Sequence, residues 1–305
     1  MRAISPKGWG EADVLQLIDT PRPEPIATEV LVRVRAASVN PTDWKSRRDG
    51  SGYWKDPVIL GYDVSGVVKE AGAGVTLFRP GDEVFGMPWF PRQAGAYAEY
   101  VTAPARHFTR KPASLDHLHA AAIPLVGLTA WQALAETAGV RQGQRVLVHA
   151  AAGGVGHVAV QIAKSLGAYV IGTASAAKHD FVTRLGADQV IDYRSVDFSE
   201  VVKDVDVVLD TIGGDYYERS LKVVRPGGHL VSLTEAIEGD RLVGGVHVGF
   251  TLVEPDHAGM KQLARLVDSG RLRVEIDSVF PLEEAAAAHR RSESGRATGK
   301  IVLTI

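Results

Sequence analysis

The sequence contains no cysteine among its 305 residues. Without a thiol, the chain can form no disulfide, use no thiolate nucleophile and offer no sulfur ligand to zinc. This absence therefore excludes disulfide-stabilised scaffolds, thiol enzymes and every cysteine-ligated zinc site.

The chain also lacks an excess of charge and a long hydrophobic run. Its 34 basic and 36 acidic residues give a net charge of −2, which favours neither nucleic acid nor an anionic membrane surface as a partner. Glycine, histidine or charged residues interrupt every apolar run well short of a membrane span. Met1 leads directly into a strand-like segment at Arg2 to Ile4, without the apolar region of a signal peptide. We therefore expect a cytoplasmic protein.

The pattern of the chain changes near residue 118, and its length suggests about two domains. Residues 1–118 contain short alternating segments punctuated by glycine and proline, which is typical of a compact β-barrel-like domain. Residues 119–265 alternate apolar strands with helical segments and predict a doubly wound parallel sheet. Residues 266–305 are too short to fold alone, and we expect them to return to the first domain.

Individual elements follow from the same patterns. Strands are predicted at 64–69, 96–101, 145–149, 169–173, 189–191, 205–210 and 229–233, with an edge strand within 244–252. Helices are predicted at 154–166, 176–185, 215–224 and 255–269, and over 120–138 with interruptions near Pro124 and Gly127.

The most informative segment is 146–175, VLVHAAAGGVGHVAVQIAKSLGAYVIGTAS. Strand, glycine cluster, helix and second strand follow one another there, as in half of a dinucleotide-binding fold. The pattern fits G-x-G-x-x-G with Ala151 in the first glycine place, then Gly153 and Gly156. Gly153 would let the backbone approach a pyrophosphate, and the amides of Gly154 and Val155 would open the helix toward an anion. Glycine-rich turns often serve only as turns, but the flanking strand and helix favour cofactor binding.

The end of the second strand indicates which dinucleotide binds. NAD sites usually carry an acidic residue there for the ribose 2′-hydroxyl. This chain has Ser175 and Lys178 instead, which suit a 2′-phosphate and favour NADP(H). The alternative is that Ser175 is a plain helix N-cap and Lys178 a solvated charge.

Several further motifs resemble one family in their order along the chain. They are residues 40–43 (NPTD), 61–66 (GYDVSG), 81–86 (GDEVFG), 95–100 (GAYAEY), 122–124 (AIP), 129–130 (TA), the glycine cluster and 299–302 (GKIV). The chain resembles the medium-chain dehydrogenase/reductase superfamily in its zinc-independent, quinone oxidoreductase (zeta-crystallin-like) branch. The resemblance implies an α/β protein with a GroES-like β-barrel-type domain, a Rossmann domain and an active site in the cleft between them. Relatives are commonly homodimers or tetramers, so we expect a homodimer.

The resemblance also implies that no catalytic metal is present. Where zinc-dependent relatives have Gly-His-Glu, this chain has Gly61, Tyr62 and Asp63. Tyrosine is not a usual zinc ligand, and one aspartate cannot hold the ion. None of the 10 histidines shows ligand spacing, and His117 and His119 are expected to be solvated.

Site residues follow from the same motifs. The resemblance places Asn40, Tyr53 and Thr129 near the nicotinamide and substrate, although Trp54 would serve as well as Tyr53 at its place. Each has an alternative role. Asn40 could be a turn residue before proline, Tyr53 an aromatic residue of a surface loop, and Thr129 part of a capped helix turn. The expected cofactor-binding residues are Ala152, Gly153, Gly154, Val155, Gly156, Ser175, Lys178, Tyr193 with its neighbour Arg194, Thr211, Gly213 and Phe250.

Three functions are compatible with these features. The favoured one is hydride transfer from NADPH to a quinone or another activated carbonyl compound, because such acceptors need no metal to polarise them. Reduction of an alkenal or enone double bond needs the same hydride geometry. The alternative from another class is a protein that binds and senses NADPH with little turnover.

Overall fold

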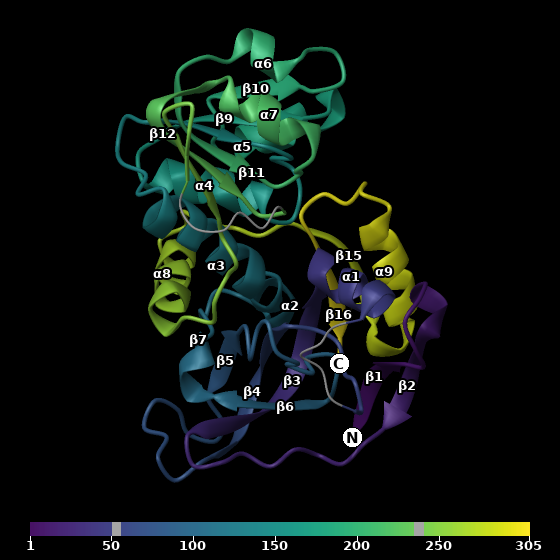
Figure 1. Cartoon of the computed structure of the whole chain (residues 1–305). Coiled ribbons are helices and arrows are strands. Elements are labelled where there is room, and N and C mark those ends of the chain that lie inside the picture. Colours follow the sequence, from purple (N-terminus) through teal and green to yellow (C-terminus); the bar gives the residue numbers. More distant parts are fainter. Residues whose placement is uncertain (51–55, 235–240) are drawn as a thin grey trace. The chain divides into compact units, whose positions relative to one another are not determined.

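A computed structural model describes residues 1–50, 56–234 and 241–305, and the chain divides by its contacts into two compact units (Figure 1). Unit one comprises Met1–Leu128, Glu254–Gly270 and Val274–Ile305. Unit two comprises Thr129–Val253 and Arg271–Arg273. The divisions by contact thus follow Leu128 and Val253, and the expected domain limits at 118/119 and 265/266 stay predictions.

Unit one is built on strands that pair antiparallel, apart from the parallel pair formed by its last two strands. They are β1 (Arg2–Pro6), β2 (Leu15–Asp19), β3 (Glu29–Val39), β4 (Asp63–Ala71), β5 (Glu83–Gly86), β6 (Tyr100–Pro104), β7 (Phe108–Arg110), β15 (Ile276–Pro281) and β16 (Lys300–Thr304). The main sheet has the order β15-β16-β3-β4-β5-β7, and β6 also pairs with β3. Arg33 and Arg35 on β3 are exposed while Val32 and Val34 are buried, as the alternating sequence predicts.

The helices of unit one pack around this sheet. They are α1 (Pro41–Asp49), α2 (His117–Ala121), α8 (His257–Asp268) and α9 (Ala285–Glu293), with short 3-10 turns at Ala12–Val14, Ala105–His107 and Leu282–Glu284. The last strand, β16, lies antiparallel to β3, with Ile301 opposite Val39 and Leu303 opposite Ala37. This pairing follows from the apolar run at residues 301–303, because the strand is buried from Lys300 to Leu303.

Unit two contains the predicted doubly wound sheet. Its strands are β8 (Arg145–Val148), β9 (Tyr169–Ala174), β10 (Gln189–Asp192), β11 (Val205–Asp210), β12 (Val224–Ser232), β13 (Arg241–Val243) and β14 (Val246–Phe250). Their order is β10-β9-β8-β11-β12-β14-β13, and all pairs are parallel except β13 with β14. The α/β fold class, with a GroES-like domain and a Rossmann-like parallel sheet, is confirmed.

Helices connect these strands. They are α4 (Gly156–Ser165), the 3-10 turn Ala176–Lys178, α5 (His179–Arg184), α6 (Phe198–Val201) and α7 (Asp215–Leu221), preceded by the π-helix Gln132–Thr137. The first eight residues of α4 are all buried, because alternate small and branched residues let it lie against the sheet. None of the helices in the described ranges is long and apolar enough to cross a membrane.

Several predicted elements were wrong in detail. Gly127 does not interrupt a helix but lies inside α3 (Pro124–Trp131), where a Cβ atom would come within 2.7 Å of the Leu263 side chain. Its function is close packing rather than a chain break. Regular pairing near 96–101 begins only at Tyr100. The segment 244–252 is not an edge strand, because Gly244 and Gly245 turn the chain so that β13 pairs outside β14.

Candidate cofactor and active site

The glycine-rich turn after β8 leaves no space for a side chain at Gly156 and little at Gly153. A Cβ atom on Gly156 would lie 2.2 Å from the Ala150 carbonyl oxygen, closer than any real contact. A Cβ atom on Gly153 would lie 3.2 Å from the same oxygen. Ala150 itself has a φ of 46°, which an L-residue rarely adopts. The turn is therefore held in a tight and strained conformation directly before α4.

Amide groups at this turn are available to an anion. Among the described residues, the backbone nitrogens of Ala152, Gly154 and Val155 donate to no other group. They lie at the start of α4, a helix of 10 residues whose N-terminal dipole adds to their attraction for negative charge. The backbone around Gly156 thus fits the pyrophosphate of a dinucleotide.

The remaining predicted cofactor residues gather at the carboxyl ends of the parallel strands. Asp192 of β10 lies opposite Ala174 of β9, so Tyr193 and Ser175, which follow them directly, are neighbours. On the other side of the sheet, Ser232 of β12 lies opposite Phe250 of β14. Ligands of open α/β sheets bind at this edge.

The strand order reverses between β8 and β11, at the turn that carries the glycine cluster. The Thr211 hydroxyl, just past β11, donates to the carbonyl oxygen of His149 at 2.9 Å and joins the two loops. Asp210 accepts hydrogen bonds from the backbone nitrogens of Ile212 and Gly213 at 2.9 and 3.0 Å. These contacts fix the two loops that border the switch point of the sheet.

Ser175 lies at the N-cap position of the 3-10 turn, but its side chain makes no capping hydrogen bond. A capping role therefore does not explain the hydroxyl. Lys178 closes the same turn, with its backbone nitrogen donating to the Ser175 carbonyl at 2.8 Å. Directly after β10, the Arg194 guanidinium lies 5.8 Å from the centre of the Tyr193 ring, and Tyr193 is 43% exposed. A hydroxyl, two cations and an exposed aromatic ring are thus present at these two strand ends.

A buried histidine next to the glycine turn escaped sequence reasoning. His149 is fully buried, and its ring contacts the Ser220 hydroxyl at 3.0 Å and the Thr173 hydroxyl at 3.3 Å. Burial, with the nearby Arg219 charge, lowers the pKa of His149 to about 3, so the ring is neutral. A single histidine after a strand gives no sequence signal for such a network. Its contacts connect β8, β9 and α7 beneath the cofactor edge.

In unit one, Asn40 is the centre of a buried polar network. It lies at the N-cap of α1 and is fully buried. Its Nδ2 donates to Asp63 at 2.7 Å, and its Oδ1 accepts from the Lys300 ammonium group at 2.5 Å. Both ends of the amide are therefore fixed in one orientation.

Asp63, at the place of the zinc-binding glutamate in zinc-dependent relatives, is surrounded by donors. It accepts from the Ser38 hydroxyl at 2.5 Å and from the Leu125 backbone nitrogen at 2.7 Å, in addition to Asn40. The Lys300 ammonium group lies 3.6 Å from the same carboxylate, and both residues are almost completely buried. Burial lowers the pKa of Lys300, while Asp63 opposes that shift. The lone pairs of Asp63 are thus used inside the protein rather than directed at a metal.

A second carboxylate, Asp43, lies on the first turn of α1. Its Oδ2 accepts from the backbone nitrogen of Asn40 at 2.7 Å and from the Tyr97 hydroxyl at 3.1 Å. Its Oδ1 has no partner among the described residues. Burial, reinforced by the Asp63 charge, raises the pKa of Asp43 to about 7. Asp43 thus supports the loop of Asn40.

The other predicted residues have different outcomes. Thr129 is buried within α3 at the start of unit two. Tyr53 and Trp54 lie outside the described residues. The expectation that His117 is solvated was wrong, because its ring contacts the Ser65 hydroxyl at 2.8 Å and Glu83 at 3.3 Å. The role of Lys300 was not predicted from the sequence, where the available signal was a lysine at the start of the apolar strand 300–304.

Comparison with known proteins shows which family has this arrangement. Residues 26–113 match the alcohol dehydrogenase GroES-like domain family, and residues 185–303 match a family described as zinc-binding dehydrogenase. A quinone oxidoreductase from Coxiella burnetii superposes with a TM-score of 0.92 at 38% identity, covering 100% of this chain and 99% of that one. The chain belongs to the medium-chain dehydrogenase/reductase superfamily, in its zinc-independent, quinone oxidoreductase-like branch.

Two further members illustrate the branch. The Escherichia coli quinone oxidoreductase complexed with NADPH superposes with a TM-score of 0.88 at 30% identity, covering 100% of each chain. The 2-methylene-furan-3-one reductase of Solanum lycopersicum is 36% identical over 99% of this chain and 79% of its own length. Proteins similar to this chain thus include reductases named for different acceptors. Despite the name of the matched C-terminal family, no group of three or more candidate metal ligands occurs among residues 1–50, 56–234 and 241–305.

Proposed function

We propose that this protein reduces quinones or related activated carbonyl compounds with NADPH as the hydride donor. It is an oxidoreductase of the quinone oxidoreductase-like branch, and NADP(H) is its cofactor. The observation that carries the proposal is the set of residues at the carboxyl edge of the unit-two sheet. Unpartnered amides at the start of α4 are available to an anion there, and Ser175 and Tyr193 follow paired strand ends.

The residues have distinct tasks in this proposal. The turn from Ala152 to Gly156 holds the pyrophosphate, and Ser175, Lys178 and Tyr193 hold the adenosine phosphate. Thr211, Gly213 and Phe250 border the nicotinamide side of the sheet. When bound, the cofactor supplies a hydride, and the chain supplies orientation and exclusion of water.

Asn40, Tyr53 and Thr129 are proposed to border the acceptor. In unit one, Lys300 and Asp63 fix the amide of Asn40 from both ends. An activated acceptor already withdraws electron density through its own carbonyl, so no metal and no strong general acid is required of these residues.

The second candidate is reduction of an enone double bond. Its support is the similarity to 2-methylene-furan-3-one reductase, whose name describes a conjugated ketone substrate. Both candidates use the same hydride donor and differ only in the acceptor.

The deciding experiment measures NADPH oxidation against a panel of quinones, enones and alkenals, with NADH in parallel and products identified by mass spectrometry. Turnover of quinones with NADPH preferred over NADH supports the first candidate. Reduced carbon–carbon bonds with inactive quinones support the second. Tight NADPH binding without turnover of any acceptor would favour a sensor of the cofactor.

We also propose a cytoplasmic homodimer. The edge strand β13 is exposed along its length, and Leu242 is 67% exposed, although such edges are commonly covered. Light scattering of the purified protein would give the oligomeric state, and cell fractionation would give the location.

A further inference from the structure

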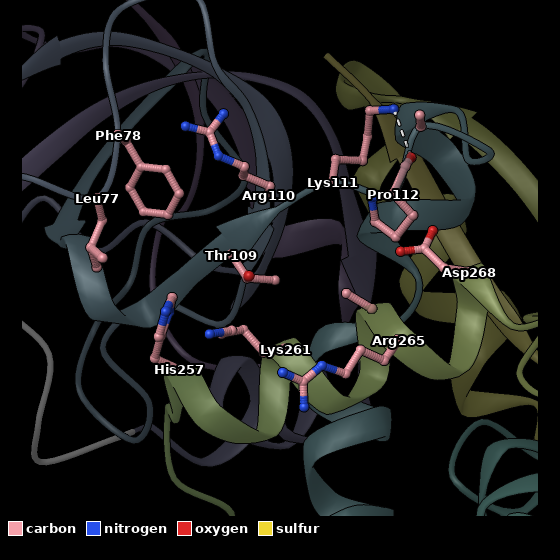
Figure 2. A pocket seen from close by; sticks show the side chains of 12 residues that line it. Leu77, Phe78, Thr109, Arg110, Lys111, Pro112, His257, Lys261, Arg265 and Asp268 are labelled. Carbon is pink, nitrogen blue, oxygen red and sulfur yellow. Dashed lines mark hydrogen bonds between the residues drawn. The ribbon is translucent and has the colours of Figure 1, made fainter.

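Unit one contains a pocket that has no part in the proposed hydride transfer. It lies between β7 and α8, has a volume of about 490 Å³, and all of its lining residues belong to unit one (Figure 2). It contains none of the residues predicted to bind the cofactor or acceptor. Its ligand must therefore be inferred from its own chemistry.

The lining is strongly unbalanced in charge. It has five basic side chains and one acidic side chain, namely Arg110, Lys111, His257, Lys261 and Arg265 against Asp268. Two of the cations already have partners, because Arg110 forms a paired contact with Asp82 at 2.7 and 2.9 Å and Lys111 contacts Glu83 at 3.2 Å. Figure 2 shows the charged ends of these two side chains directed away from α8.

The cations of α8 have no such neutralisation. Lys261 has no ion pair or hydrogen bond among the described residues, and Arg265 contacts only the neutral side chain of Gln262, at 3.3 Å. Asp268 lies three positions from Arg265, yet no ion pair joins them in the described chain. Two uncompensated cations therefore stand on the pocket side of one helix.

Their spacing makes this arrangement unfavourable without a ligand. His257, Lys261 and Arg265 lie four residues apart, so they form one row along α8. Lys261 and Arg265 carry the two formal positive charges of this row, and like charges four residues apart repel each other and destabilise a helix. A solvated helix face ordinarily mixes charges of both signs. A bound anion would neutralise the two cations and remove their repulsion. A helix face that only contacts solvent would have no such unpaired cations to neutralise.

Two other groups define the ligand more closely. Thr109 on β7 is 6% exposed, and Figure 2 shows its hydroxyl in the pocket above Lys261. The Nδ1 of His257 donates to the Phe108 carbonyl at 2.8 Å, which leaves Nε2 as the remaining polar atom of the ring. Two cations, a hydroxyl and an imidazole nitrogen match the charge and several oxygens of a phosphate group.

The opposite wall of the pocket is apolar. Leu77 is the partly exposed residue on that side, in front of Phe78, which is 4% exposed and belongs to the core, and Ala264 of α8 adds a small apolar surface between the cations. An inorganic ion alone would leave the exposed parts of Leu77 and Ala264 in contact with water, whereas an apolar group would cover them.

We propose that this pocket binds a small phosphate monoester with an apolar substituent. The phosphate contacts Lys261 and Arg265, and the substituent packs against Leu77 and Ala264. This site is independent of the proposed hydride transfer, so either proposal can fail without the other.

The test uses phenyl phosphate, inorganic phosphate and benzyl alcohol, titrated into the intact protein by calorimetry and by thermal shift. Phenyl phosphate is expected to bind and to raise Tm, with an affinity on the order of tenfold above that of inorganic phosphate. Benzyl alcohol, which lacks the anion, is expected not to bind.

Variants locate the binding. The double variant Lys261→Gln with Arg265→Gln is expected to lose phenyl phosphate binding, keep its NADPH turnover and melt slightly higher than the unliganded wild type. Lys261→Arg, which keeps the charge, is expected to bind normally. Lys178→Glu removes the predicted cofactor phosphate contact in unit two and is expected to leave this binding intact.

Two results would overturn the proposal. One is phenyl phosphate binding that survives in the double variant, which would place the site elsewhere. The other is no binding by the wild type at millimolar concentration, which would mean that the cationic row is only a solvated surface.

Discussion

Lys178 is the residue on which the predicted cofactor preference most depends. The change Lys178→Glu replaces a cation by an anion beside the predicted 2′-phosphate. We expect it to weaken NADPH at least about tenfold, or 1.4 kcal/mol, with little effect on NADH, which lacks that phosphate. Fluorescence titration with both cofactors would measure this.

The matched control for that experiment is Lys222→Glu. Lys222 is an exposed lysine at the end of α7, so its substitution by glutamate makes the same charge change in the same unit. Equal losses of NADPH and NADH affinity in Lys178→Glu would contradict the assignment of the phosphate to this residue.

Asp43 makes the stability of the protein depend on pH. Its pKa is about 7 in the folded protein against 3.8 for an ordinary aspartate, so the folded state holds a proton that the unfolded chain releases. This contribution to stability is complete below pH 3.8 and is lost as pH rises through 7. It amounts to at most about 1.4 kcal/mol per pH unit.

The variant Asp43→Asn cannot release this proton. We expect its free energy of unfolding, measured with urea from pH 4 to 8, to fall less steeply with pH than that of the wild type. The two proteins should therefore diverge as pH rises toward 8. Parallel curves would show that Asp43 does not hold the proton.

At the scale of elements, the turn between β8 and α4 offers a test of cofactor binding. Gly156 cannot be used, because a Cβ atom would collide with the Ala150 backbone and disturb the turn itself. Gly153 has more space, at 3.2 Å from the same oxygen. We expect Gly153→Val to fold, with a similar circular dichroism spectrum, and to lose NADPH binding because the side chain occupies the pyrophosphate position.

Gly8→Val is a suitable control for this change, since a Cβ atom at Gly8 meets nothing within 4 Å. It should retain both fold and affinity. Unchanged NADPH affinity in Gly153→Val would remove the glycine turn from the binding site.

The helices and strands also show which parts of the fold the sequence predicts. The alternation of strands and helices in unit two was predictable, because each apolar run of the parallel sheet is bounded by turn residues, whereas the edge position of β13 was not. The network around Asn40 was not, because its members lie on β3, α1, β4 and β16, far apart in the chain. Asp63 and Lys300 meet only through the pairing of these strands. His117 was misjudged for the same reason, since Ser65 is distant in sequence and adjacent in space.

At the scale of the whole molecule, the absence of cysteine and the occupied carboxylate of Asp63 predict a metal-free enzyme. We expect elemental analysis of the purified protein to find no stoichiometric zinc. NADPH-dependent turnover should survive dialysis against a chelator, because no step requires a Lewis acid. Complete and zinc-reversible loss of activity after chelation would contradict this prediction.

The position of β16 has a consequence for how the protein is made on the ribosome. The Lys300 ammonium group donates to the Val39 carbonyl across 261 residues of sequence. During synthesis, β3 and the carboxylate of Asp63 therefore lack this neighbour until residues 300–304 have emerged from the ribosome. Most of unit two is one continuous segment and can fold while the tail is still being translated. A nascent chain stalled before residue 300 would thus carry a finished nucleotide-binding unit beside an unfinished sheet, in which Asp63 has no cation to balance it.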